Sequence, residues 1–132
     1  MTAPDPDTFK GRTFTTRMGY AMAGLRAAWR QEASVRTHAV ACVAVVLLLA
    51  FTRAPALWWA VMALTVGAVV SAELLNTAIE ALADHLHPGR HPAIGLCKDV
   101  AAGAVLVSTL AALAVGAAFL LGHVLPWLGW LG

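Results

Sequence analysis

Apolar and polar positions alternate along the first part of the chain with the period of an α-helix. Between residues 14 and 36, large apolar side chains recur every three or four positions and form one continuous stripe. That stripe consists of Met18, Met22, Leu25 and Trp29. The remaining surface carries Arg17, Arg26 and Arg30. An apolar face with arginines on the other side is typical of a helix at a membrane surface, although a helix docked on protein would also show it.

Three longer apolar segments follow, and each is suited to cross a bilayer as a helix. Residues 36–53 give about 26 Å of helix and residues 100–121 about 33 Å, against a hydrocarbon core of about 30 Å. The middle segment, residues 56–83, begins close to a pair of tryptophans, which suit a membrane–water interface. Pro55 predicts a turn before it, and the prolines and glycine in residues 84–99 predict a loop or a broken helix after it.

The composition also indicates an integral membrane protein. Of the 132 residues, 60% are hydrophobic and 12% are charged, whereas a soluble domain carries about 25% charged residues. We therefore expect an all-α integral membrane protein. It would have a disordered tail over residues 1–13 and one domain over residues 14–132, with a surface helix and three transmembrane helices. The net charge of +2 does not point to nucleic acid. Cys42 and Cys97 share no metal-ligand spacing and give no reason to pair.

Basic residues are distributed unevenly around the three spans. Those before the first span are Lys10, Arg12, Arg17, Arg26, Arg30 and Arg36. Arg90 and Lys98 lie between the second and third spans, and Arg53 lies between the first and second. Because cytoplasmic loops carry an excess of lysine and arginine, the N-terminus and residues 84–99 are predicted to lie in the cytoplasm.

A polar stripe marks the cytoplasmic end of the middle span. Glu73, Asn76, Glu80 and Asp84 share one face of the predicted helix. Ionisable groups inside spans are costly and usually functional. Glu73, the deepest, suits a proton acceptor. It lies about 10.5 Å from Glu80 along the helix axis, too far for both to bind one ion. Glu80 with Glu32 from another helix is the more plausible pair for Mg²⁺, and Mg²⁺ often binds one or two carboxylates plus phosphates.

Other interpretations of the polar residues stay open. Asp84 can simply be solvated at the level of the lipid headgroups. His85, His87 and His91 cluster near Cys97 but lack a standard zinc-ligand spacing. The sequence contains no Walker A phosphate loop. Pattern alone therefore indicates a small membrane protein with a cytoplasmic site built from carboxylates, an amide and a lysine.

Three motifs, in order, carry a resemblance to a known family. "GLRAAWRQE" at 24–32, "ELLNTAIEALAD" at 73–84 and "KDVAAGAVL" at 98–106 resemble the small prokaryotic diacylglycerol kinases over nearly the whole chain. The resemblance implies a homotrimer in the bacterial inner membrane, with three transmembrane helices and a surface helix in each chain. It also implies transfer of the ATP γ-phosphate to a lipid alcohol at the cytoplasmic interface, giving phosphatidic acid when the lipid is diacylglycerol.

The resemblance also implies roles for single residues. Glu73 matches the catalytic base and Asn76 its polar partner in the motif. Glu32 and Glu80 match the ligands of the ATP-bound Mg²⁺. Arg36 would lie near the lipid headgroups. Besides Glu32 and Glu80, the positions that match the nucleotide site are Tyr20, Arg90, His91, Lys98 and Asp99.

Some segments depart from the enterobacterial pattern. After the surface helix this chain reads "SVRTH", where those enzymes typically read AFRQE. "HPAIGLCKDVAAGAVL" is closer to the Gram-positive branch, whose members act on undecaprenol. Diacylglycerol is the expected lipid, and undecaprenol is the alternative.

Two hypotheses come from other classes of protein. In a small ion or proton carrier, Glu73 would bind the transported ion. Few polar side chains of the second span lie between Glu73 and the far face of the membrane, which argues against this hypothesis. In a structural subunit, the small residues of the last span would allow close helix packing, as they would in a trimeric enzyme.

Overall fold

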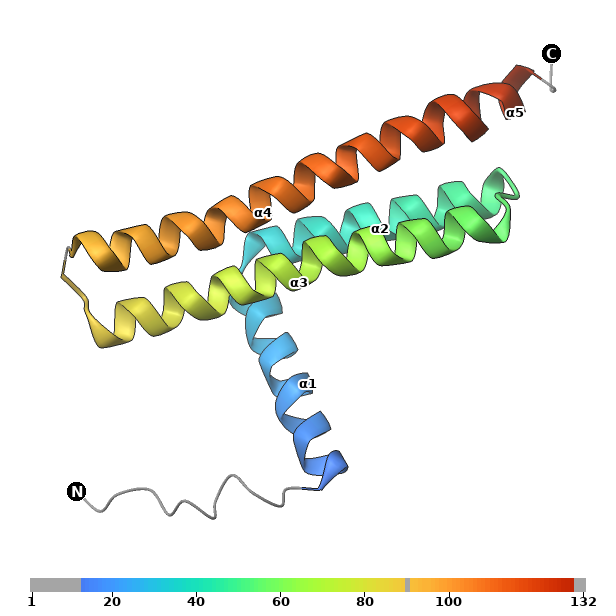
Figure 1. Cartoon of the computed structure of the whole chain (residues 1–132). Coiled ribbons are helices and arrows are strands. Elements are labelled where there is room, and N and C mark those ends of the chain that lie inside the picture. The colour runs from blue at the N-terminus through green and yellow to red at the C-terminus, as the bar shows by residue number, and fades with distance from the viewer. Residues whose placement is uncertain (1–12, 90, 130–132) are drawn as a thin grey trace. The chain divides into compact units, whose positions relative to one another are not determined.

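The computed structural model describes residues 13–89 and 91–129, and all regular structure in them is helical (Figure 1). The elements are α1 (Phe14–Gln31), α2 (Ala33–Phe51), α3 (Ala56–Leu86), α4 (Pro92–Phe119), a π-helical turn η2 (Leu120–Val124) and α5 (Leu125–Gly129). The chain divides after Gln31, so α1 is one unit and the helices from Glu32 onward are another.

Helix α1 carries the predicted amphipathic pattern but is shorter than predicted. Its apolar residues, including Met18 and Trp29, are exposed. The pattern extended to Arg36, whereas the helix ends at Gln31. Glu32 is extended, with φ −106° and ψ 120°, and α2 starts at Ala33. No proline or glycine lies at this break, so the sequence pattern did not predict it.

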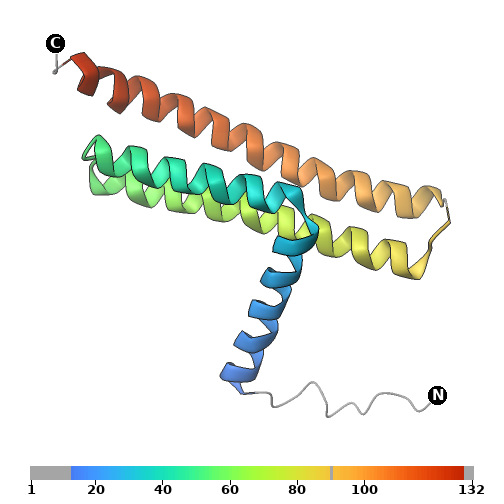
Figure 2. The ribbon, with the colours of Figure 1, turned by 180° about the vertical axis from the view of Figure 1, so that it is seen from behind.

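Helices α2 and α3 form an antiparallel hairpin through a tight turn (Figure 2). Arg53 has a φ of 51°, in the left-handed region. The amide of Ala54 donates to the carbonyl of Leu49 at 2.9 Å, and the amide of Arg53 donates to Ala50 at 3.2 Å. These two bonds form a Schellman motif, which usually places glycine where Arg53 stands. Pro55 then caps the start of α3.

Helices α3 and α4 make the most extensive contact of any two helices in the described chain, and their connection is shorter than predicted. Residues 84–99 were expected to form a loop or a broken helix. Instead α3 continues to Leu86 and α4 begins at Pro92. Proline suits the first turn of a helix, and Nδ1 of His91 accepts a hydrogen bond of 3.2 Å from the amide of Ala93. Lys98 therefore lies on α4 and not in the loop.

The best-packed core lies at the end of the bundle that holds the α2–α3 turn. Leu49, Met62, Phe119 and Val124 are buried together. Trp58 packs edge-on against Phe119, with ring centroids 5.0 Å apart.

Polar contacts reinforce the same end. Thr52 is only 2% exposed, and its hydroxyl donates to the carbonyl of Leu48 at 2.8 Å. Since that hydroxyl donates its hydrogen to Leu48, it accepts from Nε2 of His123, 3.2 Å away. The π-helical turn carries His123 and so joins the end of the third span to the end of the first.

The expected membrane architecture is confirmed. Ala33–Phe51, Ala56–Leu86 and Pro92–Gly129 are each long and apolar enough to cross a membrane. Large apolar side chains such as Val40, Leu64 and Leu106 are exposed along all three, as suits helices that meet lipid or other apolar helices. The surface position of α1 and the homotrimer stay predictions.

Candidate functional site

Glu73 on α3 lies against the start of α2. Its Oε1 atom is 3.0 Å from Nε2 of His38, and the two side chains are 13% and 26% exposed. The hydroxyl of Ser34 lies 3.4 Å from Oε2 of the same carboxylate. Ser34 and His38 are four residues apart, so both face α3 from one side of α2. The deepest carboxylate of the predicted stripe is thus held by a second helix.

Ser34 and His38 were not singled out from the sequence. Both lie in "SVRTH", the segment that departs from the enterobacterial pattern. Two polar side chains four residues apart at the start of a span would have been a usable signal, because such residues share one helix face.

Asn76 and Glu80 form the second pair of the stripe, within α3. Nδ2 of Asn76 donates to Oε1 of Glu80 at 3.0 Å. The amide oxygen of Asn76 is buried and has no hydrogen-bond partner among the residues that the structure describes. A buried acceptor without a partner is unusual and calls for a donor or a cation.

Asp84 and Lys98 form the third pair, nearest the loop. Nζ of Lys98 lies 2.9 Å from Oδ1 of Asp84, with the side chains 34% and 67% exposed. This ion pair joins the last turns of α3 to the first turns of α4. Asp84 was interpreted as a solvated carboxylate and Lys98 as a phosphate ligand, and the structure pairs them.

A pocket of about 620 Å³ lies beside this ion pair. Its polar lining comes from Asp84, His87, His91 and Lys98. The rings of His87 and His91 are 5.3 Å apart. Two of the predicted nucleotide residues, His91 and Lys98, therefore share one pocket.

The remaining predicted site residues lie at other positions along the chain. Glu32 is half-buried at the N-cap of α2. Arg36 and Asp99 are exposed, on α2 and α4. Tyr20 belongs to α1, which is described by itself, and Arg90 lies outside the described residues.

A three-ligand metal site is not found in the described ranges, 13–89 and 91–129. No three side chains of the His, Cys, Asp and Glu types gather there closely enough to hold an ion. The pairing of Glu32 with Glu80 stays a prediction.

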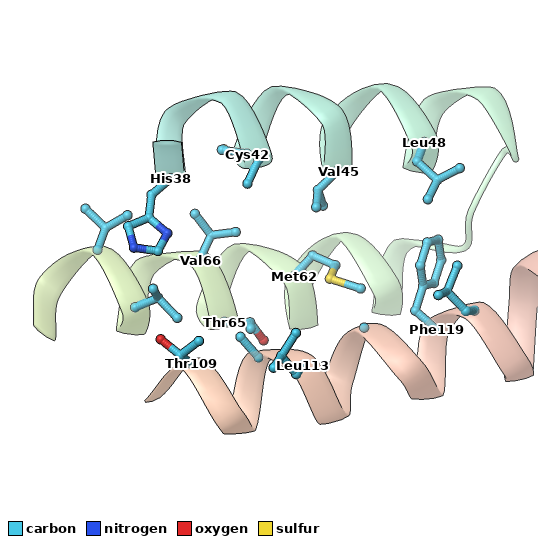
Figure 3. Close-up of a pocket in the computed structure, with 16 residues that line it drawn as sticks. His38, Cys42, Val45, Leu48, Met62, Thr65, Val66, Thr109, Leu113 and Phe119 are labelled. Atoms are coloured by element: carbon cyan, nitrogen blue, oxygen red, sulfur yellow. The ribbon is translucent and has the colours of Figure 1, made fainter. Parts of the chain in front are cut away.

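An apolar groove of about 390 Å³ runs between α2, α3 and α4 (Figure 3). Its lining is mainly aliphatic, with Thr65 and Thr109 among the few polar side chains. Figure 3 shows His38 at one end and Phe119 at the other. His38 therefore contacts Glu73 and also lines the apolar groove.

The family model and the relatives that match this chain all point to one family of proteins. The family model described as prokaryotic diacylglycerol kinase matches residues 19–120. The diacylglycerol kinase of Escherichia coli K12 is 33% identical over 80% of this chain and 86% of its own length. That of Pseudomonas aeruginosa is 37% identical over 89% of this chain and 98% of its own length. The undecaprenol kinase of Bacillus subtilis is 36% identical over 66% of this chain and 71% of its own length.

The match extends from α1 through α4, so it includes the first two spans, most of the third and every pair of the polar stripe. With the membrane helices and these pairs in place, the chain belongs to the prokaryotic diacylglycerol kinase family, as its three motifs predicted.

Proposed function

We propose that this protein transfers the γ-phosphate of ATP to the hydroxyl of diacylglycerol and so forms phosphatidic acid. The observation that carries the proposal is the position of His38, which holds the Glu73 carboxylate and also lines one end of an apolar groove. A base beside an apolar channel suits a substrate that has a hydroxyl at one end and hydrocarbon behind it. The similarity to the E. coli and P. aeruginosa enzymes supports diacylglycerol, and the similarity to the B. subtilis enzyme supports undecaprenol as the alternative.

Glu73 is the proposed general base. Phosphoryl transfer needs positioning and charge neutralisation, together with a group that accepts the proton of the attacking hydroxyl. Glu73 is 13% exposed, and His38 on α2 holds its Oε1 atom, so the carboxylate is positioned before the substrate arrives. A positioned base contributes about 10²- to 10⁴-fold to such a reaction.

Asn76 and Glu80 fit the proposed magnesium site. Mg²⁺ prefers hard oxygen ligands and usually takes one or two carboxylates together with substrate phosphates. The buried Asn76 amide oxygen lacks a partner in the described residues, and the Glu80 carboxylate lies one turn away. Glu32 at the start of α2 is the second proposed carboxylate. The bound ion would supply charge neutralisation at the phosphates, while Asn76 orients Glu80 through its N–H group.

The nucleotide would extend along the stripe toward the loop. Glu80 lies about 10 Å from Glu73 along α3, and Asp84 lies about 6 Å further. The pocket beside Asp84 offers the Lys98 ammonium group, suited to phosphate, and the His91 ring, suited to stacking or hydrogen bonding. Tyr20, Arg90 and Asp99 are further proposed nucleotide residues, on the family resemblance alone.

The lipid would enter from the side of the bundle. Its hydrocarbon would occupy the groove between α2, α3 and α4, and Arg36 on α2 would lie near the headgroups. The uneven distribution of basic residues supports a cytoplasmic N-terminus. The family resemblance supports the bacterial inner membrane and a homotrimer.

Phosphate transfer to each lipid tests the proposal directly. Detergent-purified protein is given radiolabelled ATP, Mg²⁺ and either diacylglycerol or undecaprenol, and the labelled lipid is separated and counted. Glu73→Gln serves as the control for a contaminating kinase. We expect labelled phosphatidic acid from the wild type and at least about 100-fold less from Glu73→Gln. Label in undecaprenol alone would move the substrate to the alternative, and label in neither lipid by folded protein would refute the proposal.

A further inference from the structure

We propose that His38 is a positioning residue that orients the carboxylate of Glu73 and selects which of its two oxygens accepts the substrate proton. This inference rests on the proposed function, because it concerns how the base is held. It comes from the 3.0 Å contact between Nε2 of His38 and Oε1 of Glu73, which joins the start of α2 to the middle of α3.

The direction of this hydrogen bond follows from the chemistry of the base. A carboxylate that is to accept a proton must be ionised, and an ionised carboxylate only accepts hydrogen bonds. Nε2 of His38 must therefore carry the hydrogen and donate it to Oε1. This holds whether the imidazole ring is neutral or charged.

The two oxygens of Glu73 are not equivalent in this arrangement. Oε1 has a short bond to His38, whereas Oε2 has only the Ser34 hydroxyl at 3.4 Å. Hydroxyl hydrogen bonds are normally 2.5–3.0 Å long, so the contact to Ser34 is weak and easily exchanged. Oε2 is thus the oxygen that is available to a substrate hydroxyl. By holding Oε1, His38 would fix the direction in which Oε2 points.

The surroundings of the His38 ring favour a fixed orientation. The ring is 26% exposed and lines the end of the apolar groove. The part of α4 that lines this groove contributes Thr109 and apolar residues, with no charged side chain. Cys42, one turn along α2, lines the groove as well. Glu73 is the charged side chain that contacts His38 within the described chain, so the ring has one strong partner to align with.

Paired substitutions separate positioning from simple packing. The side chain of glutamine places its amide nitrogen, Nε2, near the position of Nε2 in histidine, so it can still donate to Oε1 of Glu73. The shorter side chain of asparagine places its amide nitrogen near the position of Nδ1 in histidine, from where it cannot reach Oε1 of Glu73. We expect His38→Ala and His38→Asn to lower kcat about 10- to 100-fold with the KM for ATP unchanged. His38→Gln should recover about tenfold of that loss.

His123 provides the matched control. It is also half-buried, on another helical segment, and hydrogen-bonded across the bundle, to Thr52 at 3.2 Å, but at the end away from Glu73. His123→Ala should therefore loosen the bundle about as much as His38→Ala while leaving kcat near that of the wild type. Equal losses of kcat in His38→Ala and His123→Ala, or equal activity of His38→Gln and His38→Asn, would overturn the positioning role.

Exchange of the Nε2 proton of His38 with water tests the contact without an activity assay. In protein with ¹⁵N-labelled histidine, the Nε2 proton of His38 should exchange slowly with water, and it should exchange rapidly in Glu73→Ala. Rapid exchange in the wild type would contradict the contact. If the wild type phosphorylates a lipid and His38→Ala keeps the wild-type kcat, this inference fails and the proposed function stands. If the wild type phosphorylates no lipid, the proposed function fails first.

Discussion

Asn76 donates a hydrogen bond of 3.0 Å to Glu80 one turn further along α3, while its own amide oxygen is buried without a partner in the described chain. The amide can be assigned in only one orientation here, because a carboxylate accepts and only the NH₂ group donates. A buried acceptor left unmatched costs about 1–3 kcal/mol. We infer that its partner is supplied from outside the described residues, by a cation, a water molecule or a second copy of the chain.

Glu80→Gln should weaken the use of magnesium more than it weakens the chemical step. Glutamine keeps the size of the side chain and an oxygen that can accept from Asn76, but removes the negative charge that attracts the ion. We expect the Mg²⁺ concentration for half-maximal activity to rise about tenfold or more, with much of the rate recovered at high Mg²⁺. Titration of activity with Mg²⁺ at fixed ATP measures this, and an unchanged midpoint would remove Glu80 from the metal site.

Glu73→Gln should remove most of the turnover and spare nucleotide binding. Glutamine can still accept from His38 through its amide oxygen, but it cannot take the proton of a hydroxyl. We expect kcat to fall about 10²- to 10⁴-fold, with the dissociation constant for ATP within about threefold of that of the wild type. Turnover is measured as labelled lipid, and binding is measured with a fluorescent ATP analogue. Wild-type turnover would show that Glu73 is not the base.

Gly116→Leu should block the apolar groove. Gly116 lines the groove, and a Cβ added there meets nothing within 4 Å, so a larger side chain can enter without strain. We expect the KM for the lipid to rise about tenfold and the KM for ATP to stay unchanged, because the proposed nucleotide residues His91 and Lys98 lie toward the loop.

Ala114→Leu on the same helix is the control for this effect. Ala114 is exposed and does not line the groove, so the lipid KM should not change. An equal rise in both variants would mean that the groove does not receive the lipid.

Arg53→Gly should stabilise the turn between α2 and α3. Arg53 holds a φ of 51° at the position of the Schellman motif where glycine is favoured. Removing its Cβ should stabilise the fold by about 0.5–1 kcal/mol. Reversible unfolding in mixed micelles would measure the free energy, with Arg53→Ala as the control that removes the charge but keeps the Cβ. Equal stability of the glycine and alanine variants would contradict the explanation.

The arrangement of the polar stripe could be predicted because it is local. Glu73, Asn76 and Glu80 fall on one face of any α-helix that continues through them, and α3 does continue. Their partners on other helices could not be predicted in the same way. His38 is 35 residues from Glu73, and their contact depends on how α2 and α3 align across the turn at Arg53.

The helix ends were harder to predict than the helices, for different reasons at each break. The break at Glu32 has no proline or glycine to mark it. The start of α4 did carry a signal: Pro92 was interpreted as a loop residue, although proline is equally common in the first turn of a helix.

The bundle keeps its best-packed residues and its Glu73–His38 pair at opposite ends. Leu49, Phe119 and Thr52, each no more than 2% exposed, hold the helices together beside the α2–α3 turn, while Glu73 and His38 lie toward the other end. In a small protein the same few residues often serve both packing and ligand binding, so a change of ligand can destabilise the fold. Phe119 also lines the groove, but Leu49 and Thr52 do not. A change of acceptor alcohol, from a two-chain glycerolipid to a long isoprenoid, would require changes along the groove and none at Leu49 or Thr52. One short chain would thereby accept a different membrane lipid while the residues that pack beside the α2–α3 turn stay the same.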